Sequence, residues 1–344
     1  MNPQPVDEVT VACVGAGYFS QFHIRSWLRM PSVKLVGVCD QDIAKAQATG
    51  VASFDDLPAM LKSQNPTVLD IIVPPAAQAQ AISTALAHGV KWIICQKPFC
   101  RSLHEARTIV AKARQADAIL VIHENFRFQP WYRCIKSAID DALIGEVLQM
   151  TFRLRPGDGQ GLRAYLDRQP YFQSMERFLV HETAVHWIDT FQYLFGELVA
   201  VYADLRRLNP AIAGEDSGHI LFDHASGVRA LFDGNRLLDH ASDNPRRTMG
   251  EALIEGTKGS IDLLGDGSVG LRRFGRSSRQ MIRSPDTSPE FGGDCVHALQ
   301  SHVIEGIVDG SAVENAAQDY LKVIEVEEAI YKSAETGQKL ELAM

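Results

Sequence analysis

The stretch VACVGAGYFS, residues 11–20, decides the fold and lies close to the N-terminus. Its apolar run predicts a β-strand that enters a Gly-x-Gly turn, and residues 21–28 predict a helix after the turn. A strand, a glycine turn and a helix in this order begin a dinucleotide-binding βαβ unit, because glycines let the backbone approach a pyrophosphate and the helix start favours anions. The residues expected to hold the cofactor here are Gly15, Ala16, Gly17, Tyr18 and Phe19.

Ser20 stands where the third glycine of the motif is expected, and a small residue there still permits the helix to pack closely on the strand. An ordinary glycine turn without a ligand remains the alternative. The second strand, residues 33–40, supports the cofactor because Asp40 follows Gly17 by 23 residues, near the usual spacing of about 20 for the acid that binds the ribose. A carboxylate there repels the extra phosphate of NADP, and Gln41 offers no guanidinium to pair it, so we expect NAD rather than NADP. The alternative role for Asp40 is the N-cap of a helix that begins at Ile43.

Strand-like and helical segments then alternate. Apolar runs at 68–73, 91–95 and 119–123 predict strands, and residues 76–88 and about 103–116 predict helices. This alternation indicates an α/β fold, a doubly wound parallel sheet of the Rossmann type. Ligands bind such sheets at the carboxyl ends of the strands, where Pro74, Gln96 and Lys97 lie. Lys97, pinned by Pro98 at a strand end, is the first candidate for chemistry, with a solvated loop lysine as the alternative.

Composition excludes several classes of protein. A length of 344 residues suggests two domains, and the formal charge of −8 argues against nucleic-acid binding. The N-terminus does not resemble a signal peptide, and no apolar run is long enough for a membrane helix, so a cytoplasmic protein is expected. The six cysteines form no Cys-x-x-Cys pair or zinc-like cluster. We therefore expect buried free thiols and no metal site.

Further motifs extend over nearly the whole chain and share one order and spacing. Together they resemble the Gfo/Idh/MocA family of NAD(P)-dependent oxidoreductases. The matching segments are VGAG at 14–17, CD at 39–40, IVPP at 72–75, QKP at 96–98, ENFRF-x-P at 124–130, HWID at 186–189, LFGE at 194–197 and IEGT-x-G at 254–259. By this resemblance, the cofactor contacts also include Val73, Pro75, Gln78 and Arg127.

The resemblance implies a Rossmann domain over residues 1–126 and an α+β domain over residues 127–344 with a large, open, mostly antiparallel sheet. The sequence agrees, because strand-like segments without crossover helices occur at 147–155, 200–205, 218–222, 228–232 and 249–255. In the family this sheet commonly packs against that of a partner. A homodimer or homotetramer is therefore implied.

The second chemical centre is the segment 181–194, whose apolar spacing predicts a helix. Glu182, His186 and Asp189 then share one face. By resemblance His186 is the catalytic histidine, Lys97 its partner, and Glu182 occupies the position of the family's usual aspartate. Histidine can accept a hydroxyl proton near neutrality, and a lysine ammonium can stabilise charge on the reacting oxygen. The alternative for His186 is a packed histidine bonded to Glu182 or Asp189.

Two further positions depart from the family pattern: Gln96 replaces a glutamate and Gln78 replaces a histidine. Arginines and tyrosines could line a substrate site and bind a carboxylate or hydroxyl groups, although each could also be solvated on a loop. They are Arg127, Arg153, Arg155, Arg163, Tyr165, Arg168 and Tyr171.

The resulting hypothesis is an oxidoreductase that transfers a hydride between NAD(P) and a hydroxyl or carbonyl of a sugar, sugar acid, lactone or cyclitol. A non-catalytic NAD-binding sensor and an NAD-assisted glycoside hydrolase remain as alternatives.

Overall fold

The computed structural model describes residues 8–342, which divide into two compact units. The first runs to Asn125 and also includes Val296–Ile324, and the second contains Phe126–Cys295 and the chain after Glu325. The expected boundary at 126/127 lies beside the first crossing between the units. The prediction that everything after it forms one domain does not hold for residues 296–324, which return to the first unit through long-range contacts that local sequence patterns do not reveal.

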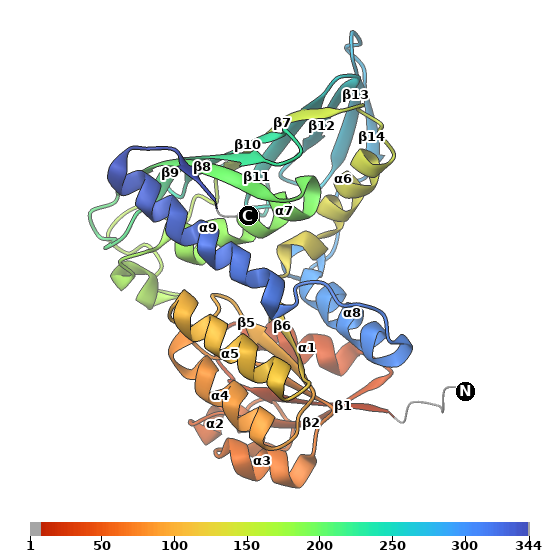
Figure 1. Cartoon of the computed structure of the whole chain (residues 1–344), viewed down its shortest axis with the longest axis vertical. Helices are drawn as coiled ribbons and strands as arrows, with labels where there is room; N and C mark the ends of the chain where they lie inside the picture. Colours follow the sequence, from red (N-terminus) through yellow and green to blue (C-terminus); the bar gives the residue numbers. More distant parts are fainter. Residues whose placement is uncertain (1–7, 343–344) are drawn as a thin grey trace. The chain divides into compact units, whose positions relative to one another are not determined.

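A six-stranded, all-parallel sheet in the order β3-β2-β1-β4-β5-β6 forms the centre of the first unit (Figure 1). Buried side chains on both faces explain the near-continuous apolar runs of its central strands. The strands are β1 (Val9–Val14), β2 (Val33–Cys39), β3 (Ser53–Phe54), β4 (Val68–Ile71), β5 (Trp92–Gln96) and β6 (Ile119–His123).

The helices of this unit begin and end at residues suited to those positions. Asp42, Asp56 and Ser102 cap the N-termini of α2, α3 and α5, each accepting a backbone N–H with its side chain. The cap of α2 is therefore Asp42 and not Asp40. Helices α4 and α5 lie side by side and contact strands of the sheet (Figure 1). The helices are α1 (Ser20–Arg29), α2 (Ile43–Gln47), α3 (Leu57–Gln64), α4 (Pro75–Ala87) and α5 (Leu103–Gln115), with α8 (Cys295–Asp309) and α9 (Ala317–Thr336) at the C-terminal crossings.

The second unit is built on a nine-stranded sheet in the order β14-β13-β12-β11-β7-β10-β9-β8-β15. All its neighbours pair antiparallel except β10 and β7, so the sheet is mostly antiparallel, as expected. The strands are β7 (Val147–Leu154), β8 (Leu198–Arg206), β9 (Ser217–His224), β10 (Arg229–Asn235), β11 (Gly250–Gly256), β12 (Gly259–Leu263), β13 (Val269–Arg273), β14 (Arg279–Arg283) and β15 (Leu340–Glu341). The helical segments are η1 (Phe126–Phe128), α6 (Pro130–Asp140), η2 (Pro170–Ser174), η3 (Leu179–Ala184), α7 (Val185–Phe195) and η4 (Phe291–Gly293).

The two faces of this sheet differ in what covers them. On the inner face, Trp187 of α7 stacks on Phe152 of β7 with ring centroids 4.3 Å apart and packs on Phe232 of β10 at 5.5 Å. On the other face, the strand register places Tyr202, Leu221, Leu231, Thr151 and Leu253 in one row across five strands. Tyr202 and Leu253 are 37% and 41% exposed, so this row presents apolar side chains outside the core.

Across residues 8–342, no helix combines the length and the apolar character needed to cross a membrane. The six cysteines are free thiols, five of them buried and Cys134 partly so. Burial raises the pKa of the Cys13, Cys39 and Cys95 thiols above the usual range, which keeps them protonated and unreactive.

Candidate active site

The glycine turn after β1 combines one glycine that the fold requires with one that faces open space. Gly15 has φ +98°, and a Cβ there would lie 2.2 Å from the carbonyl oxygen of Ile72. A Cβ at Gly17 would meet no protein atom within 4 Å. Ser20, 1% exposed, begins α1 where only a small side chain packs. The open side of the turn therefore lies at a helix N-terminus and fits the pyrophosphate of a dinucleotide.

Asp40 follows the end of β2 and reaches back to this turn. Its Oδ2 accepts the backbone N–H of Ala16 at 2.7 Å, and its Oδ1 accepts that of Asp42 at 2.9 Å. The carboxylate thus lies beside the glycine turn, where a ribose hydroxyl would be recognised.

Gln78 lies on α4 and is completely buried. Its Nε2 donates to the carbonyls of Val73, Gln96 and Pro98 at 3.2, 2.8 and 3.0 Å. Its Oε1 accepts the backbone N–H of Cys100 at 2.7 Å. These bonds join the end of β4 to the loop around Lys97, so the amide holds the loop in place.

Gln96 ends β5 and belongs to a second buried network. Its Oε1 accepts the backbone N–H of Lys97 at 2.8 Å, and its Nε2 lies 3.0 Å from Nε2 of His23. The other nitrogen of His23 lies 2.8 Å from Oδ2 of Asp70. His23 and Asp70 were not among the predicted site residues, although a carboxylate inside the apolar run of β4 indicates a buried partner.

The segment around His186 differs from the regular helix expected over 181–194. Leu179–Ala184 forms a π-helical turn, η3, and the α-helix begins only at Val185. The prediction of α-helix is therefore wrong over residues 181–184. Glu215 provides the physical reason, because its Oε1 accepts the N–H groups of Phe178 and Val180 at 3.1 and 3.0 Å and satisfies donors at the start of the wide turn.

His186 is 7% exposed and stacks on Phe126 of η1, with ring centroids 3.8 Å apart and planes 4° from parallel. Stacking fixes the plane of the imidazole. One turn further along α7, Asp189 accepts two hydrogen bonds from Arg127, from Nε at 2.8 Å and from Nη2 at 2.6 Å. This bidentate pair joins η1 to α7 and thereby holds Phe126 against His186.

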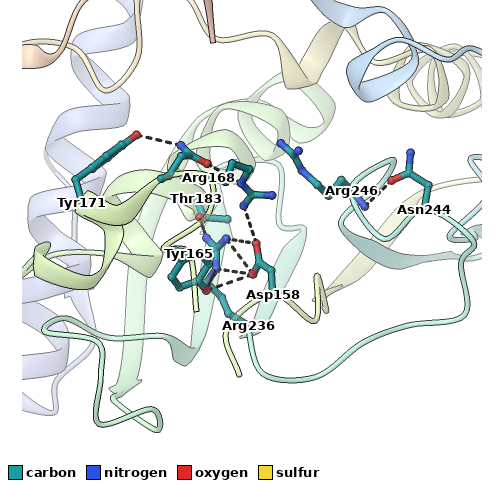
Figure 2. A network of polar contacts seen from close by, with 9 residues as sticks. Asp158, Tyr165, Arg168, Tyr171, Thr183, Arg236, Asn244 and Arg246 are labelled. Carbon is teal, nitrogen blue, oxygen red and sulfur yellow. Dashed lines mark hydrogen bonds and ion pairs between the residues drawn. The ribbon is translucent and has the colours of Figure 1, made fainter. Parts of the chain in front are cut away.

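Figure 2 shows a polar network next to η3, in which Asp158 lies between two guanidinium groups. Arg236 and Arg168 donate to its Oδ2 at 2.9 and 3.1 Å, and Arg236 also donates to Thr183 Oγ1 at 2.6 Å. Burial alone would raise the pKa of Asp158, but the two guanidinium groups outweigh it and the pKa lies below its usual value. Tyr165 joins this network, since its hydroxyl lies 2.9 Å from Nε of Arg236.

The other arginines and tyrosines predicted to line a substrate site differ in burial and in their partners. Arg155 is buried and pairs with Asp233 of the sheet at 2.6 Å, whereas Arg153 and Arg163 form exposed ion pairs. Tyr171 is 54% exposed and accepts a hydrogen bond from Gln169. Partial desolvation of the phenol and the charge of Glu182 raise the pKa of Tyr171 to about 12. Of the predicted lining groups, the structure thus brings Tyr165 and Arg168 into the network beside Thr183, and Gln169 links Tyr171 to Arg168 (Figure 2). The network also contains Arg236, for which the sequence carried no signal.

In the part of the chain that the structure describes, no group of three or more His, Cys, Asp or Glu side chains could hold a metal ion.

Comparisons with known proteins identify the family to which the chain belongs. Residues 9–124 match the model of the oxidoreductase family with an NAD-binding Rossmann fold, and residues 132–262 match the GFO/IDH/MocA C-terminal domain. D-apiose dehydrogenase from Paraburkholderia graminis is 31% identical over 96% of this chain and 89% of its own length. The D-apiose dehydrogenase from Rhizobium rhizogenes is 28% identical over 97% of this chain and 98% of its own.

Among solved structures, an oxidoreductase from Agrobacterium radiobacter in complex with NAD+, L-tartaric acid and magnesium superimposes with a TM-score of 0.88. It is 26% identical, and the match covers 97% of this chain and 98% of that one. Levoglucosan dehydrogenase in complex with NADH and L-sorbose shares the fold, with a TM-score of 0.79 and 19% identity over 98% of this chain and 99% of its own. The chain therefore belongs to the Gfo/Idh/MocA oxidoreductase family and is an NAD-dependent dehydrogenase.

Proposed function

We propose that the protein oxidises one hydroxyl group of a small polyhydroxylated molecule, with Lys97 and His186 at the reacting oxygen. The match to two D-apiose dehydrogenases over nearly the whole chain carries the substrate class. An inositol 2-dehydrogenase from Rhizobium meliloti, 24% identical over 74% of this chain and 74% of its own length, extends the class to cyclitols. A free sugar, a sugar acid, a lactone or a cyclitol therefore fits better than a larger substrate.

The turn at Gly15–Phe19 would hold the pyrophosphate of NAD, and Asp40 would accept hydrogen bonds from its ribose. When bound, NAD supplies the acceptor for the hydride that leaves the substrate carbon. The imidazole of His186 accepts the proton of the hydroxyl group. The Lys97 ammonium donates a hydrogen bond to the same oxygen and stabilises the negative charge that develops on it. Glu182, in the π-turn before α7, orients the imidazole, and Arg127 fixes α7 through Asp189.

A substrate panel tests this proposal directly. NADH formation is measured with D-apiose, other pentoses and hexoses, their aldonic acids and lactones, and inositols, and each compound is repeated with NADP+. Turnover with at least one compound, faster with NAD+, is the expected result. Tight NAD binding with no turnover would contradict the proposal and favour a sensor. Sugar release from glycosides without net NADH formation would instead indicate NAD-assisted hydrolysis.

We also propose a homo-oligomer that forms through the outer face of the nine-stranded sheet in a cytoplasmic protein. The row through Tyr202, Leu231 and Leu253 supports this, because its exposed and half-buried apolar side chains are contiguous, and such patches commonly mark an interface. Light scattering during size-exclusion chromatography should give a multiple of the chain mass, reduced in Leu253→Asp. A wild-type protein that elutes as a monomer would overturn the proposal.

A further inference from the structure

A chain of hydrogen bonds connects a buried carboxylate to the backbone of Lys97 within the first unit. Asp70 and His23 are both fully buried, and Gln96 is 9% exposed. Oδ2 of Asp70 also accepts from Trp27 Nε1 at 2.8 Å and from Gln300 Nε2 at 3.3 Å. Three donors therefore surround one carboxylate oxygen, an arrangement that suits an ionised carboxylate.

The backbone N–H of Lys97 determines which atom donates and which accepts in each of these hydrogen bonds. A backbone N–H can only donate, so it fixes Oε1 of Gln96 toward Lys97. The amide nitrogen of Gln96, which also can only donate, then faces Nε2 of His23. That ring nitrogen must accept, and the ring proton therefore lies on Nδ1, from which it is donated to Asp70. His23 is consequently neutral, and the network carries one negative charge.

We propose that Gln96, held by His23 and Asp70, is a positioning residue for Lys97 and that its amide keeps His23 neutral. The proposal rests on the proposed function, which places Lys97 at the reacting oxygen. Gln78 fixes the carbonyls on either side of Lys97, and Gln96 fixes its N–H. Two neutral amides thus set the path of the backbone from which the catalytic ammonium extends.

Two aromatic rings pack against the imidazole of His23. His123 packs against its ring with centroids 4.0 Å apart, and Phe19 contacts it at 5.6 Å. On the other side of the network, burial and the charge of Asp70 raise the pKa of the Cys13 and Cys95 thiols. The amide of Gln96 does not titrate.

The variant Gln96→Glu tests this coupling, because it changes one donor into an acceptor with almost no change in shape. With His23 protonated, two carboxylates and one imidazolium carry the same net charge as the wild-type network. As the pH rises and the imidazolium loses its proton, two carboxylates face one neutral ring and the network opens. We expect kcat of Gln96→Glu to fall tenfold or more toward alkaline pH and to recover on return to acid.

Gln80→Glu is the matched control, since it makes the same change at an exposed position of α4 and should keep the wild-type pH profile. NAD affinity, measured in parallel, shows whether the first unit is intact. A Gln96→Glu enzyme with wild-type kcat and pH profile would overturn the positioning role. Lys97→Ala separates the two proposals: wild-type turnover in Lys97→Ala overturns the proposed function, whereas an inactive Lys97→Ala beside an unaffected Gln96→Glu overturns only the role of Gln96.

A measurement on the unmodified protein applies even if the variant does not fold. Long-range ¹H–¹⁵N spectra of ¹⁵N-histidine-labelled protein distinguish the two neutral tautomers from the imidazolium, and His23→Gln identifies the signals of His23. At neutral pH we expect a neutral ring with its proton on Nδ1, as the hydrogen bonds of Gln96 and Asp70 require. A proton on Nε2, or an imidazolium, would contradict the deduced direction of the hydrogen bonds and overturn the proposal.

Discussion

The guanidinium of Arg236 donates to both carboxylate oxygens of Asp158, at 3.2 Å to Oδ1 and 2.9 Å to Oδ2, and the side chain of Arg236 is only 3% exposed. Figure 2 shows that the same arginine reaches Thr183, at the π-turn that precedes α7. This ion pair thus connects the loop after β7 to the segment that leads to His186.

Removal of the carboxylate should be strongly destabilising. Asp158→Asn leaves a buried guanidinium without its counter-charge and should lower the free energy of unfolding by about 3–5 kcal/mol in urea denaturation at neutral pH. Because the pKa of Asp158 is lowered in the folded protein, its stabilising contribution is present above the pKa of the unfolded chain and is lost as the pH falls through the folded value. The difference between wild type and Asp158→Asn should therefore shrink in acid.

An exposed ion pair provides the contrast for this prediction. Arg163 and Asp167 are 78% and 86% exposed, so Arg163→Ala should change stability by less than about 1 kcal/mol. A comparable loss in Arg163→Ala and Asp158→Asn would show that burial does not set the cost.

His186→Asn should remove the proton acceptor while leaving the nucleotide site intact. We expect kcat to fall by about 10²–10⁴-fold with little change in NAD affinity, because a positioned general base contributes acceleration of this order. Steady-state NADH formation and fluorescence titration with NAD measure the two effects. His219→Asn, at a histidine that is 61% exposed, should behave as wild type.

Alanine at the two glycines of the turn should separate folding from binding. Gly15→Ala places a methyl group 2.2 Å from the Ile72 carbonyl oxygen at a positive φ, so we expect a lower melting temperature and lost NAD binding. The methyl group added in Gly17→Ala would meet no protein atom within 4 Å, so the variant should keep the wild-type melting temperature. The same methyl group would obstruct the approach of the pyrophosphate, so NAD affinity should fall at least tenfold. Unchanged affinity in Gly17→Ala would exclude a close approach of the cofactor to this residue.

Asp40→Asn should relax the preference for NAD over NADP. The amide oxygen can still accept the N–H of Ala16, so the turn survives, although the bond from the N–H of Asp42 is lost. The negative charge that repels the extra phosphate is removed. We expect the ratio of kcat/KM values for NAD and NADP to fall about tenfold. Asp42→Asn, at the exposed cap of α2, should leave that ratio unchanged.

Strands buried on both faces were predictable to within a few residues, because β1, β4 and β5 read as short apolar runs that end in glycine, proline or a polar residue. The strands β12 to β14 were not. They are short, two of them contain several arginines, and β14 is largely exposed, so pairing with neighbours and not local pattern makes them strands.

The parts of the candidate site that could be predicted are those that lie at turns and strand ends. The turn at Gly15 and Gly17 and the strand end at Lys97 follow from the order of elements along the chain. The buried polar pairs near the site could not be predicted in this way. His23 and Asp70, like Asp158 and Arg236, are separated by tens of residues in the sequence. The π-turn before His186 was also missed, because it depends on the carboxylate of Glu215, which lies on a different segment.

The return of residues 296–324 to the first unit affects the order in which the chain can fold during synthesis. The last of the six parallel strands leaves the ribosome with His123, yet Gln300 donates to Asp70, His297 lies 3.1 Å from the Ser26 hydroxyl, and the carbonyl of Asn315 accepts the N–H of Ile122. A nascent chain that has completed the sheet therefore still lacks these partners. The first unit therefore reaches its final form only after residues 296–324 have been made, so the sequence of the second unit that lies in between is synthesised before the first unit is finished.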